Sequence, residues 1–391
     1  MRREDFSISA WVAGFLAVLI SYCGPLVIFI QAAQAGGMSQ QMLTSWIWAI
    51  SIGAGVSGLV LSVWLRQPII TAWSAPGTAL LLSLFPHITM PEVVGAYLMA
   101  AALVIKISIT DSFEKIVDRI PKGIAAGMMA GILFQFGTQA FRASMELPSV
   151  VFAMLAAYLL GKRYLPRYAI VLVALTGLAV AYAMGTTHLS SLALVTARPV
   201  FTAPSFDVGV FLSFTVPLLM VSLTGQYLPG MAVLRLAGYR TPSRAVVTGT
   251  GLASMLVACF GGITIVLASG TAAGCAGKGA HADADKRYVA GIANGVFYLV
   301  GATFAGTIVL VFSAFPPALI AALAGLALIG AIVSNISLLA QDSASIEPSV
   351  IAFLATASGM SLFGLGAAFW GVVLGMAAHG LLRVARPQTN G

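Results

Sequence analysis

Two short segments place helix-breaking and hydroxyl residues inside stretches that are otherwise apolar enough to cross a membrane. The first reads TAWSAPGTALL over residues 71–81, and the second reads VLASGTAAG over 266–274. Irregular backbone at membrane depth is tolerated only where it is buried in protein or lines a polar cavity. A single proline–glycine break is more often just a kink, but two matched breaks favour a binding site inside the membrane.

The residues of each break predict where a short helix begins. Pro76 suits the first turn of a helix, and Ser74 just before it is a good N-cap. We therefore predict extended or irregular backbone over 68–75 and a short helix over 76–86. In the second segment we expect Ser269 to cap a helix that begins with the next residue.

Two helix N-termini at one depth could bind an anion or an acceptor-rich ring. Each presents unpaired N–H groups and a partial positive charge. The dipole contributes about 0.3–1 kcal/mol for each exposed terminus, and a hydrogen bond to a charged acceptor adds about 1.5–3 kcal/mol. These magnitudes favour a singly charged ligand. The candidate binding residues of the two segments are Trp73, Ser74, Ala75, Pro76, Gly77, Thr78, Ala268, Ser269, Gly270 and Thr271.

Four further polar residues lie in the middle of the first predicted helix of each half. They are Ser21, Tyr22, Gln226 and Tyr227. A buried amide such as that of Gln226 wants several partners and can bind a carboxylate or a ring edge. Hydroxyls and amides in membrane helices also simply join helices to one another, and Trp73 could stack on an aromatic ligand or only pack.

The composition is that of a polytopic membrane protein. Of the 391 residues 59% are hydrophobic and 8% charged, against about 25% charged in soluble domains. Apolar runs of about 20 residues recur along the chain, as all-α membrane proteins require. We predict 14 transmembrane segments, at 10–34, 43–65, 68–86, 91–110, 121–138, 147–164, 168–185, 208–234, 243–261, 262–276, 288–312, 317–338, 348–362 and 364–384.

The basic residues predict the orientation of these segments. With both termini in the cytoplasm, only Arg142 and Arg198 of the 20 Lys and Arg residues fall outside. The net charge of +8 therefore reflects topology and some contact with anionic lipid rather than nucleic-acid binding.

The two halves of the chain carry traces of a repeat. SAPGTA at 74–79 resembles LASGTA at 267–272, and a proline lies in the first helix of each half. We predict a first seven-helix repeat over 1–200 and a second over 201–391. Because seven is odd, the halves would insert in opposite orientations, as in many secondary transporters. The third and tenth segments are the broken ones.

No catalytic pattern accompanies these features. The sequence contains no H-E-x-x-H, no G-x-S-x-G and no P-loop, so we predict no enzyme activity and a transport process driven by gradients rather than ATP. Its three cysteines are widely spaced, and we predict neither a metal site nor a cofactor. A channel would need a continuous polar path, which the two isolated breaks do not provide.

The sequence resembles the benzoate/proton symporter family over nearly its whole length. The resemblance is carried by TAWSAPGTALL (71–81), GQYLPGMAVLRLAGY (225–239), AGKGAHADADKRYVAGIANGVFYL (276–299) and ASGMSLFGLGAAFWGVVLG (357–375). It implies a bacterial inner-membrane carrier that binds benzoate between the third and tenth helices, helped by the first and eighth. It further implies relation to the nucleobase–ascorbate transporter fold, with interleaved core and gate domains and a homodimer through the gate.

The chain departs from that family at two places. Gly225, Gln226 and Tyr227 stand where the family usually has Ser-Gln-Asn, and KGAHAD replaces Pro-Glu-Ala-His-Pro-Asp at 278–283. His281 and Asp283 remain as candidates for proton coupling, although the substrate carboxylate could carry its own proton. The departures leave open another organic anion or a nucleobase-like substrate.

Overall fold

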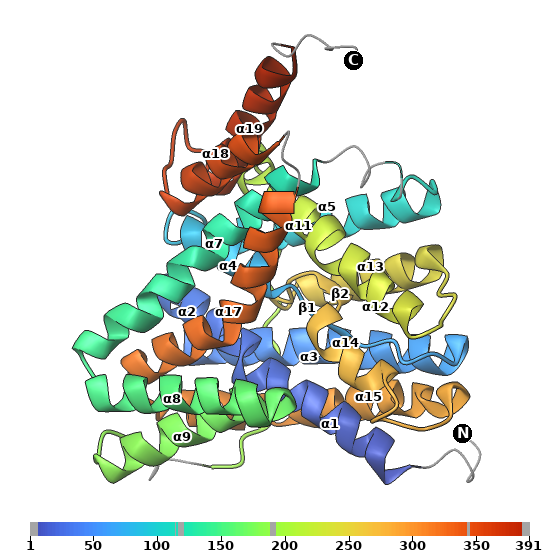
Figure 1. The fold of residues 1–391 in the computed structure, drawn as a ribbon, viewed down its shortest axis with the longest axis vertical. Coiled ribbons are helices and arrows are strands. Elements are labelled where there is room, and N and C mark those ends of the chain that lie inside the picture. Colours follow the sequence, from blue (N-terminus) through green and yellow to red (C-terminus); the bar gives the residue numbers. More distant parts are fainter. Residues whose placement is uncertain (1–6, 114, 116–120, 188–192, 342–344, 385–391) are drawn as a thin grey trace.

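The computed structural model describes residues 7–113, 115, 121–187, 193–341 and 345–384. Several charges used in the topology prediction lie outside these ranges, among them Arg2, Arg3, Arg119 and Arg386. The described chain is helical with one two-stranded sheet, and the two strands meet near the middle of the molecule (Figure 1).

The described residues of the first half form eleven elements. They are α1 (Ile8–Cys23), α2 (Pro25–Ala35), α3 (Gln40–Leu65), β1 (Thr71–Trp73), α4 (Ala75–Leu84), α5 (Met90–Ile109), α7 (Lys122–Arg142), the 3-10 turn η2 (Ala143–Met145), α8 (Pro148–Tyr164) and α9 (Ala169–Ala183), with the short turn η3 (Pro166–Tyr168) before α9. A capping box at Thr89 and Glu92 starts α5, and the Ser39 hydroxyl caps α3 by accepting from the Met42 amide at 3.2 Å.

The second half begins with a helix that contains two π-helical turns. It runs through α10 (Val208–Val210), η5 (Phe211–Thr215), α11 (Val216–Ser222), η6 (Leu223–Tyr227) and α12 (Leu228–Leu236). After it come α13 (Ser243–Ala258), β2 (Ile265–Leu267), α14 (Ser269–Ala276), η7 (Ala284–Lys286), α15 (Tyr288–Thr303), α16 (Ala305–Ser313), α17 (Pro317–Gln341), α18 (Ile346–Ala357) and α19 (Ala367–Val384).

The helices pack as two groups. The pair α3 and α15 and the pair α5 and α13 lie close to the sheet, with α1 against α15. A second group joins α7, α17, α18 and α19, and the hairpin of α8 and α9 packs on α17. In Figure 1, α18 and α19 project at one end of the molecule and α8 and α9 lie at the other.

Six described helices are long and apolar enough to cross a membrane, or seven if the bent pair of α15 and α16 is one span. Five others are apolar but only 10–17 residues long. The molecule is thus an all-helical membrane protein, while the count of 14 segments, the inverted repeat and the two domains stay predictions.

The predicted segment at 288–312 is not one straight helix. Its two parts meet at Phe304 with a bend of 71°. The bend frees backbone groups, and a distant part of the chain binds them: the Ala197 amide donates to the Thr303 carbonyl at 3.0 Å, and the Thr307 amide donates to the Val195 carbonyl at 3.2 Å. The segment predicted at 348–362 is also shorter than expected, since α18 ends at Ala357.

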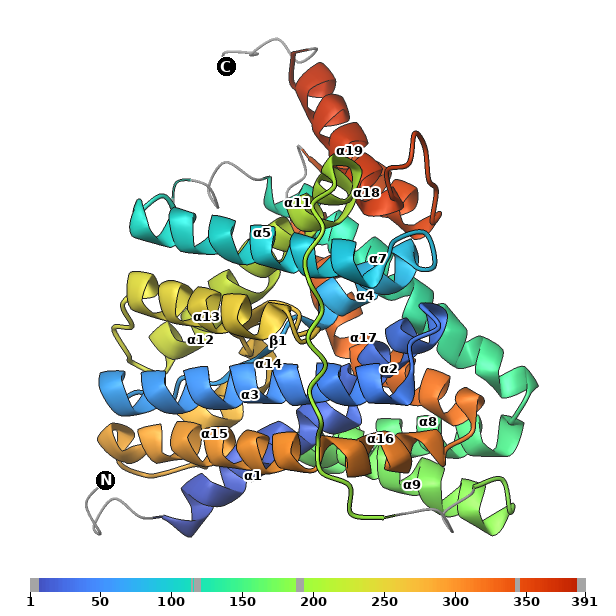
Figure 2. The same cartoon turned by 180° about the vertical axis from the view of Figure 1, so that it is seen from behind.

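Residues 193–206 form an extended connecting segment between α9 and α10. Figure 2 shows it crossing in front of α3 and α5. Its amides at Val200, Thr202 and Ser205 donate to the Ser45 hydroxyl, the Cys259 carbonyl and the Pro91 carbonyl, respectively, at 2.8 Å each. The segment is therefore bound along its length to helices from both halves.

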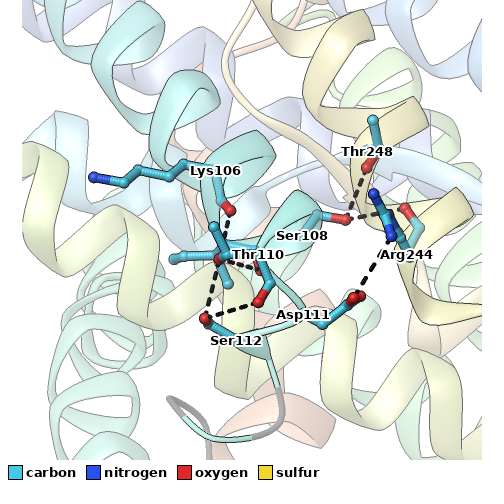
Figure 3. A network of polar contacts seen from close by, with 8 residues as sticks. Lys106, Ser108, Thr110, Asp111, Ser112, Arg244 and Thr248 are labelled. Atoms are coloured by element: carbon cyan, nitrogen blue, oxygen red, sulfur yellow. Dashed lines mark hydrogen bonds and ion pairs between the residues drawn. The ribbon is translucent and has the colours of Figure 1, made fainter.

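A polar network joins the end of α5 to the start of α13 (Figure 3). The buried Ser108 hydroxyl bonds to the Arg244 carbonyl at 3.0 Å and to the Thr248 hydroxyl at 2.8 Å. Asp111 and the Arg244 guanidinium are 3.5 Å apart, and both side chains are well exposed. Asp111 thus forms part of a surface contact.

Candidate functional site

The two broken segments meet as an antiparallel pair of strands. Ala72 lies opposite Val266, and Trp73 lies opposite Ile265. Beyond the strands the pairing continues, because the Ser74 amide donates to the Thr264 carbonyl at 2.9 Å and the Ala268 amide to the Ile70 carbonyl at 3.0 Å. The short helices α4 and α14 start directly after the strands, so their N-terminal ends lie near the same junction.

The first helix begins much as its sequence predicts. The Ser74 hydroxyl accepts a hydrogen bond from the Gly77 amide at 3.1 Å, which confirms Ser74 as the N-cap. The helix starts at Ala75, one residue earlier than predicted, with Pro76 in its first turn. Thr78 turns its hydroxyl back to the Ser74 carbonyl at 2.9 Å.

The second helix is capped differently from the prediction. It begins at Ser269 itself, the N-cap position is Ala268, and no side chain caps it. Ser269 is therefore not the cap. The segment has no proline to fix the first turn, so Ser269 takes helical geometry and the amides at the start of α14 keep more of their donor capacity.

Hydroxyl groups of neighbouring helices bind the two strands. On the β1 side, Thr71 donates to the Ala54 carbonyl at 2.7 Å, and Ser57 donates to Thr71 at 3.1 Å. On the β2 side, Ser254 accepts from the Ile265 amide at 2.8 Å, and the Tyr227 hydroxyl donates to the Ile265 carbonyl at 3.1 Å. Buried strands inside a membrane need such partners for their unpaired backbone groups.

Tyr227 consequently supports the strand β2. Its side chain is buried, and its hydroxyl is shared between the Ile265 carbonyl and the Thr250 hydroxyl at 2.7 Å. The tyrosine holds β2 in place from η6, with no donor capacity left over for a ligand. Ser21 is also buried, and its hydroxyl returns to the Ala17 carbonyl at 3.0 Å within the same helix.

Three aromatic rings cluster beside the first strand. The rings of Tyr22 and Trp73 are nearly parallel, with centroids 6.0 Å apart, and Tyr298 meets both edge-on at 5.7 and 6.0 Å. The Tyr22 hydroxyl bonds to Ser51 at 2.7 Å. Sequence reasoning missed Tyr298 and Ser51, because only tertiary packing brings α3 and α15 to the same place. The sequence signal was weak, because α15 contains two tyrosines, Tyr288 and Tyr298.

Gln226 lies in the π-helical turn η6, which packs against β2 and α7. Its side-chain oxygen is buried and has no hydrogen-bond partner among the described residues. Leaving such an atom without a partner costs about 1–3 kcal/mol, and π-helical turns are frequent at functional sites. Both features are consistent with a side chain whose hydrogen-bond partner is a ligand.

The accessible candidates lie mainly at the start of α14. Gly270 is exposed, and Ser269 and Thr271 are partly exposed, whereas Ser74, Gly77 and Thr78 are buried in α4. A methyl group added at Gly270 or Gly274 would meet no atom within 4 Å. One face of α14 therefore borders open space, while Ser74, Gly77 and Thr78 at the start of α4 are covered.

His281 and Asp283 lie in the loop after α14, away from the strand junction. The His281 Nδ1 accepts from the Asp283 amide at 3.0 Å, and the Asp283 carboxylate accepts from the Asp285 amide at 3.0 Å. Both side chains thus stabilise the local turn. No group of three or more metal-binding side chains occurs within the described ranges.

A large groove of about 600 Å³ lies elsewhere, on the outer surface of α1 and α15. Ile8, Trp11, Val12, Phe15 and Phe297 line it. Apolar and aromatic side chains on the outside of membrane helices are what lipid tails contact, so this groove offers nothing for a carboxylate. The strand junction remains the candidate site despite its tighter packing.

The fold matches those of solved anion transporters. One is the transmembrane domain of the cyanobacterial bicarbonate transporter BicA, with a TM-score of 0.60 and 14% identity over 96% of this chain and 98% of that one. Another is the murine anion transporter Slc26a9 in its inward-facing state, with a TM-score of 0.60 and 13% identity over 98% of this chain and 69% of that one. At such identities the likeness concerns the fold alone; the suggested relation to the nucleobase–ascorbate fold stays a prediction.

Sequence comparison is more specific. The chain is 53% identical over 380 residues to the benzoate membrane transport protein of Acinetobacter baylyi, covering 97% of this chain and 96% of that one. It is 35% identical over 373 residues to the inner membrane protein YdcO of Escherichia coli, covering 95% of each. A family model described as benzoate membrane transport protein matches residues 4–381. The chain therefore belongs to the benzoate membrane transport protein family, whose members are membrane transporters and not enzymes.

Proposed function

We propose that this protein is a secondary active transporter for a small aromatic carboxylate, with benzoate as its substrate and a proton as the coupling ion. The observation that carries the proposal is the meeting of the two broken segments, which brings the N-termini of α4 and α14 to one junction beside an aromatic cluster. The relative from Acinetobacter baylyi, named for benzoate, supports the choice of substrate.

The anionic end of the substrate fits the start of α14. Ala268, Ser269 and Gly270 are accessible there, and no side chain caps the helix. Main-chain amides at a helix N-terminus bind anions without a cationic side chain. The side-chain amide of Gln226, whose oxygen has no partner among the described residues, is the candidate for a further hydrogen bond to the carboxylate, which its Nε2 group would donate.

The aromatic end of the substrate fits the rings of Tyr22 and Trp73. Aromatic pairs contribute about 0.5–1.5 kcal/mol beyond burial of their area. Tyr22 is partly exposed and already stacks on Trp73, so its ring can present a face to a ligand. Carboxylate and ring would then be bound by different elements, which favours aromatic acids over simple anions.

Movement between the two packing groups would give alternating access. The group of α7, α17, α18 and α19 meets the strand-bearing group through α2 against α17, α4 and η6 against α7, and η5 against α19. In this proposal the protein lies in the bacterial inner membrane with both termini in the cytoplasm and forms a homodimer through the second group. His281 and Asp283, in the loop after α14, are the candidates for proton coupling.

Counterflow in proteoliposomes tests the proposal. Vesicles loaded with unlabelled benzoate at neutral pH should accumulate labelled benzoate, and vesicles loaded with uracil should not. An acidic exterior should drive net uptake that a protonophore abolishes. Folded protein without benzoate counterflow would refute the choice of substrate and turn attention to another organic anion; flux that does not saturate would indicate a channel.

A further inference from the structure

The C-terminal end of α14 is bound by a buried arginine. Arg287 lies directly before α15, and its side chain is 7% exposed. The guanidinium donates from Nη1 to the Ala276 carbonyl at 2.9 Å, from Nε to the His281 carbonyl at 2.8 Å and from Nη2 to the Ala282 carbonyl at 3.3 Å. All three acceptors are main-chain carbonyls rather than carboxylates.

This arrangement joins two helices through the loop between them. Ala276 is the last residue of α14, where carbonyls lack helical partners and carry a partial negative charge. A guanidinium satisfies such groups from a rigid, planar set of donors, which a lysine ammonium does not possess. Arg287 therefore fixes the end of α14 to the start of α15.

Two other contacts hold the same loop. The Ser9 hydroxyl of α1 donates to the Ala280 carbonyl at 2.8 Å, and the Tyr239 hydroxyl donates to the Ala284 carbonyl at 2.7 Å. Burial raises the pKa of the Tyr239 phenol, and the nearby Arg287 partly opposes this effect. The loop is thus bound to α1, to the end of α12 and to α15.

The position of α14 depends strongly on these contacts because the helix is short. It has eight residues, and the face that contains Gly270 and Gly274 borders open space. No described residue lies within 4 Å of a Cβ added on that side, so no described neighbour limits the movement of the helix there. A shift at Ala276 is therefore carried to Ser269 at the other end of the same short helix.

We propose that Arg287 is a positioning residue for transport: by holding the C-terminus of α14, it sets where the N-terminus of that helix meets the substrate at the strand junction. The inference rests on the proposed function. Arg287 does not touch the substrate, and its role is geometric rather than one of charge attraction.

The test compares Arg287→Lys and Arg287→Gln with Lys278→Gln, which removes an exposed positive charge from the same loop. Benzoate counterflow is measured over a range of concentrations. Both Arg287 variants should raise the half-saturating concentration by about tenfold while the maximal rate per folded protein changes little. Lys278→Gln should leave both values as in the wild type. Tyr239→Phe, a milder change, should raise the half-saturating concentration in the same direction.

A changed maximal rate with an unchanged half-saturating concentration would overturn the proposal, as would full activity of Arg287→Lys, which would show that charge alone matters. Trypsin cleavage after Lys278 gives a measurement without substrate. It should be faster in Arg287→Lys than in the wild type, and equal rates would refute the anchoring. If wild-type protein shows no benzoate counterflow, the proposed function fails, and the cleavage rates still decide whether Arg287 holds the loop.

Discussion

The indole ring of Trp73 lies nearly parallel to the ring of Tyr22, at an angle of 26° and with 6.0 Å between the centroids. Trp73 ends β1, and Tyr22 comes from the end of α1, so the pair joins the strand junction to the first helix of the chain. The indole nitrogen of Trp73 has no hydrogen-bond partner among the described residues. The ring therefore contributes through its faces and edges.

Replacing Trp73 separates its aromatic role from its bulk. Trp73→Phe loses no hydrogen bond and should keep the half-saturating benzoate concentration within about twofold of the wild type, whereas Trp73→Leu should raise it about 2- to 12-fold, the range that an aromatic contact supplies. Counterflow over a range of benzoate concentrations measures both.

Trp46, also buried with a nitrogen that has no partner among the described residues, is the matched control. Its leucine variant should lower stability without changing substrate affinity; a change of affinity there would contradict the assignment to Trp73.

Gln226 should show opposite effects on stability and transport. Gln226→Leu removes a buried oxygen that has no partner, so the free energy of unfolding should stay constant or rise by about 1 kcal/mol. The half-saturating concentration of benzoate should rise about tenfold, because the ligand loses a hydrogen bond to a charged acceptor. Thermal unfolding in detergent and counterflow give the two values.

Gln31 in α2 offers the control for Gln226. Its side-chain oxygen is also buried without a partner among the described residues, but it lies on another helix. Gln31→Leu should reproduce the effect on stability and leave transport unchanged. Equal losses of transport in the two variants would mean that Gln226 has no special contact with the substrate.

The open face of α14 should accept small additions and reject large ones. Gly274→Ala meets no atom within 4 Å and replaces glycine in a helix, which should stabilise the protein by about 0.5–1 kcal/mol. Gly274→Phe should fold but abolish counterflow by filling the space beside the helix.

Gly14 in α1 supplies the contrast. A Cβ there would lie 2.6 Å from the Ala290 carbonyl oxygen, so Gly14→Ala must force α1 and α15 apart and should reduce the yield of folded protein. Size-exclusion chromatography of the detergent-extracted variants measures this yield. Normal transport by Gly274→Phe would show that the open face is not part of the substrate path.

The network in Figure 3 should depend on its hydroxyl more than on its ion pair. Asp111 and Arg244 are both well exposed, and exposed pairs contribute about 0–1 kcal/mol, so Asp111→Asn should change the midpoint of thermal unfolding very little. Ser108→Ala removes two partly buried hydrogen bonds between α5 and α13 and should cost about 1–3 kcal/mol. We therefore expect Ser108→Ala to lower the midpoint of thermal unfolding more than Asp111→Asn does. A larger loss in Asp111→Asn would contradict this prediction.

Much of the helical organisation follows from local sequence, and the start of α4 shows why. Ser74 and Pro76 determine the first turn through contacts within three residues, so the cap was predictable. The start of α14 was predicted wrongly because Ser269 lacks a neighbouring proline and settles into the helix instead. A hydroxyl alone does not decide which residue is the cap.

Features that depend on distant residues were beyond prediction. The bend at Phe304 is stabilised by residues such as Val195, whose amide donates to the Thr307 hydroxyl across 112 positions of the chain. Tyr298 joins the aromatic cluster only because α1, α3 and α15 pack together. Hydropathy locates such helices but carries no information on which of their faces meet.

During synthesis, the connecting segment is made before the bent helix pair that it contacts. Residues 193–206 leave the ribosome before α15 and α16, and they bind to Thr303 and Thr307 at the bend. The bent pair therefore completes its backbone hydrogen bonds on a partner that is already made. A ribosome-bound chain that stops after Ser313 contains every residue of this contact. A chain that stops before Thr303 contains only the connecting segment.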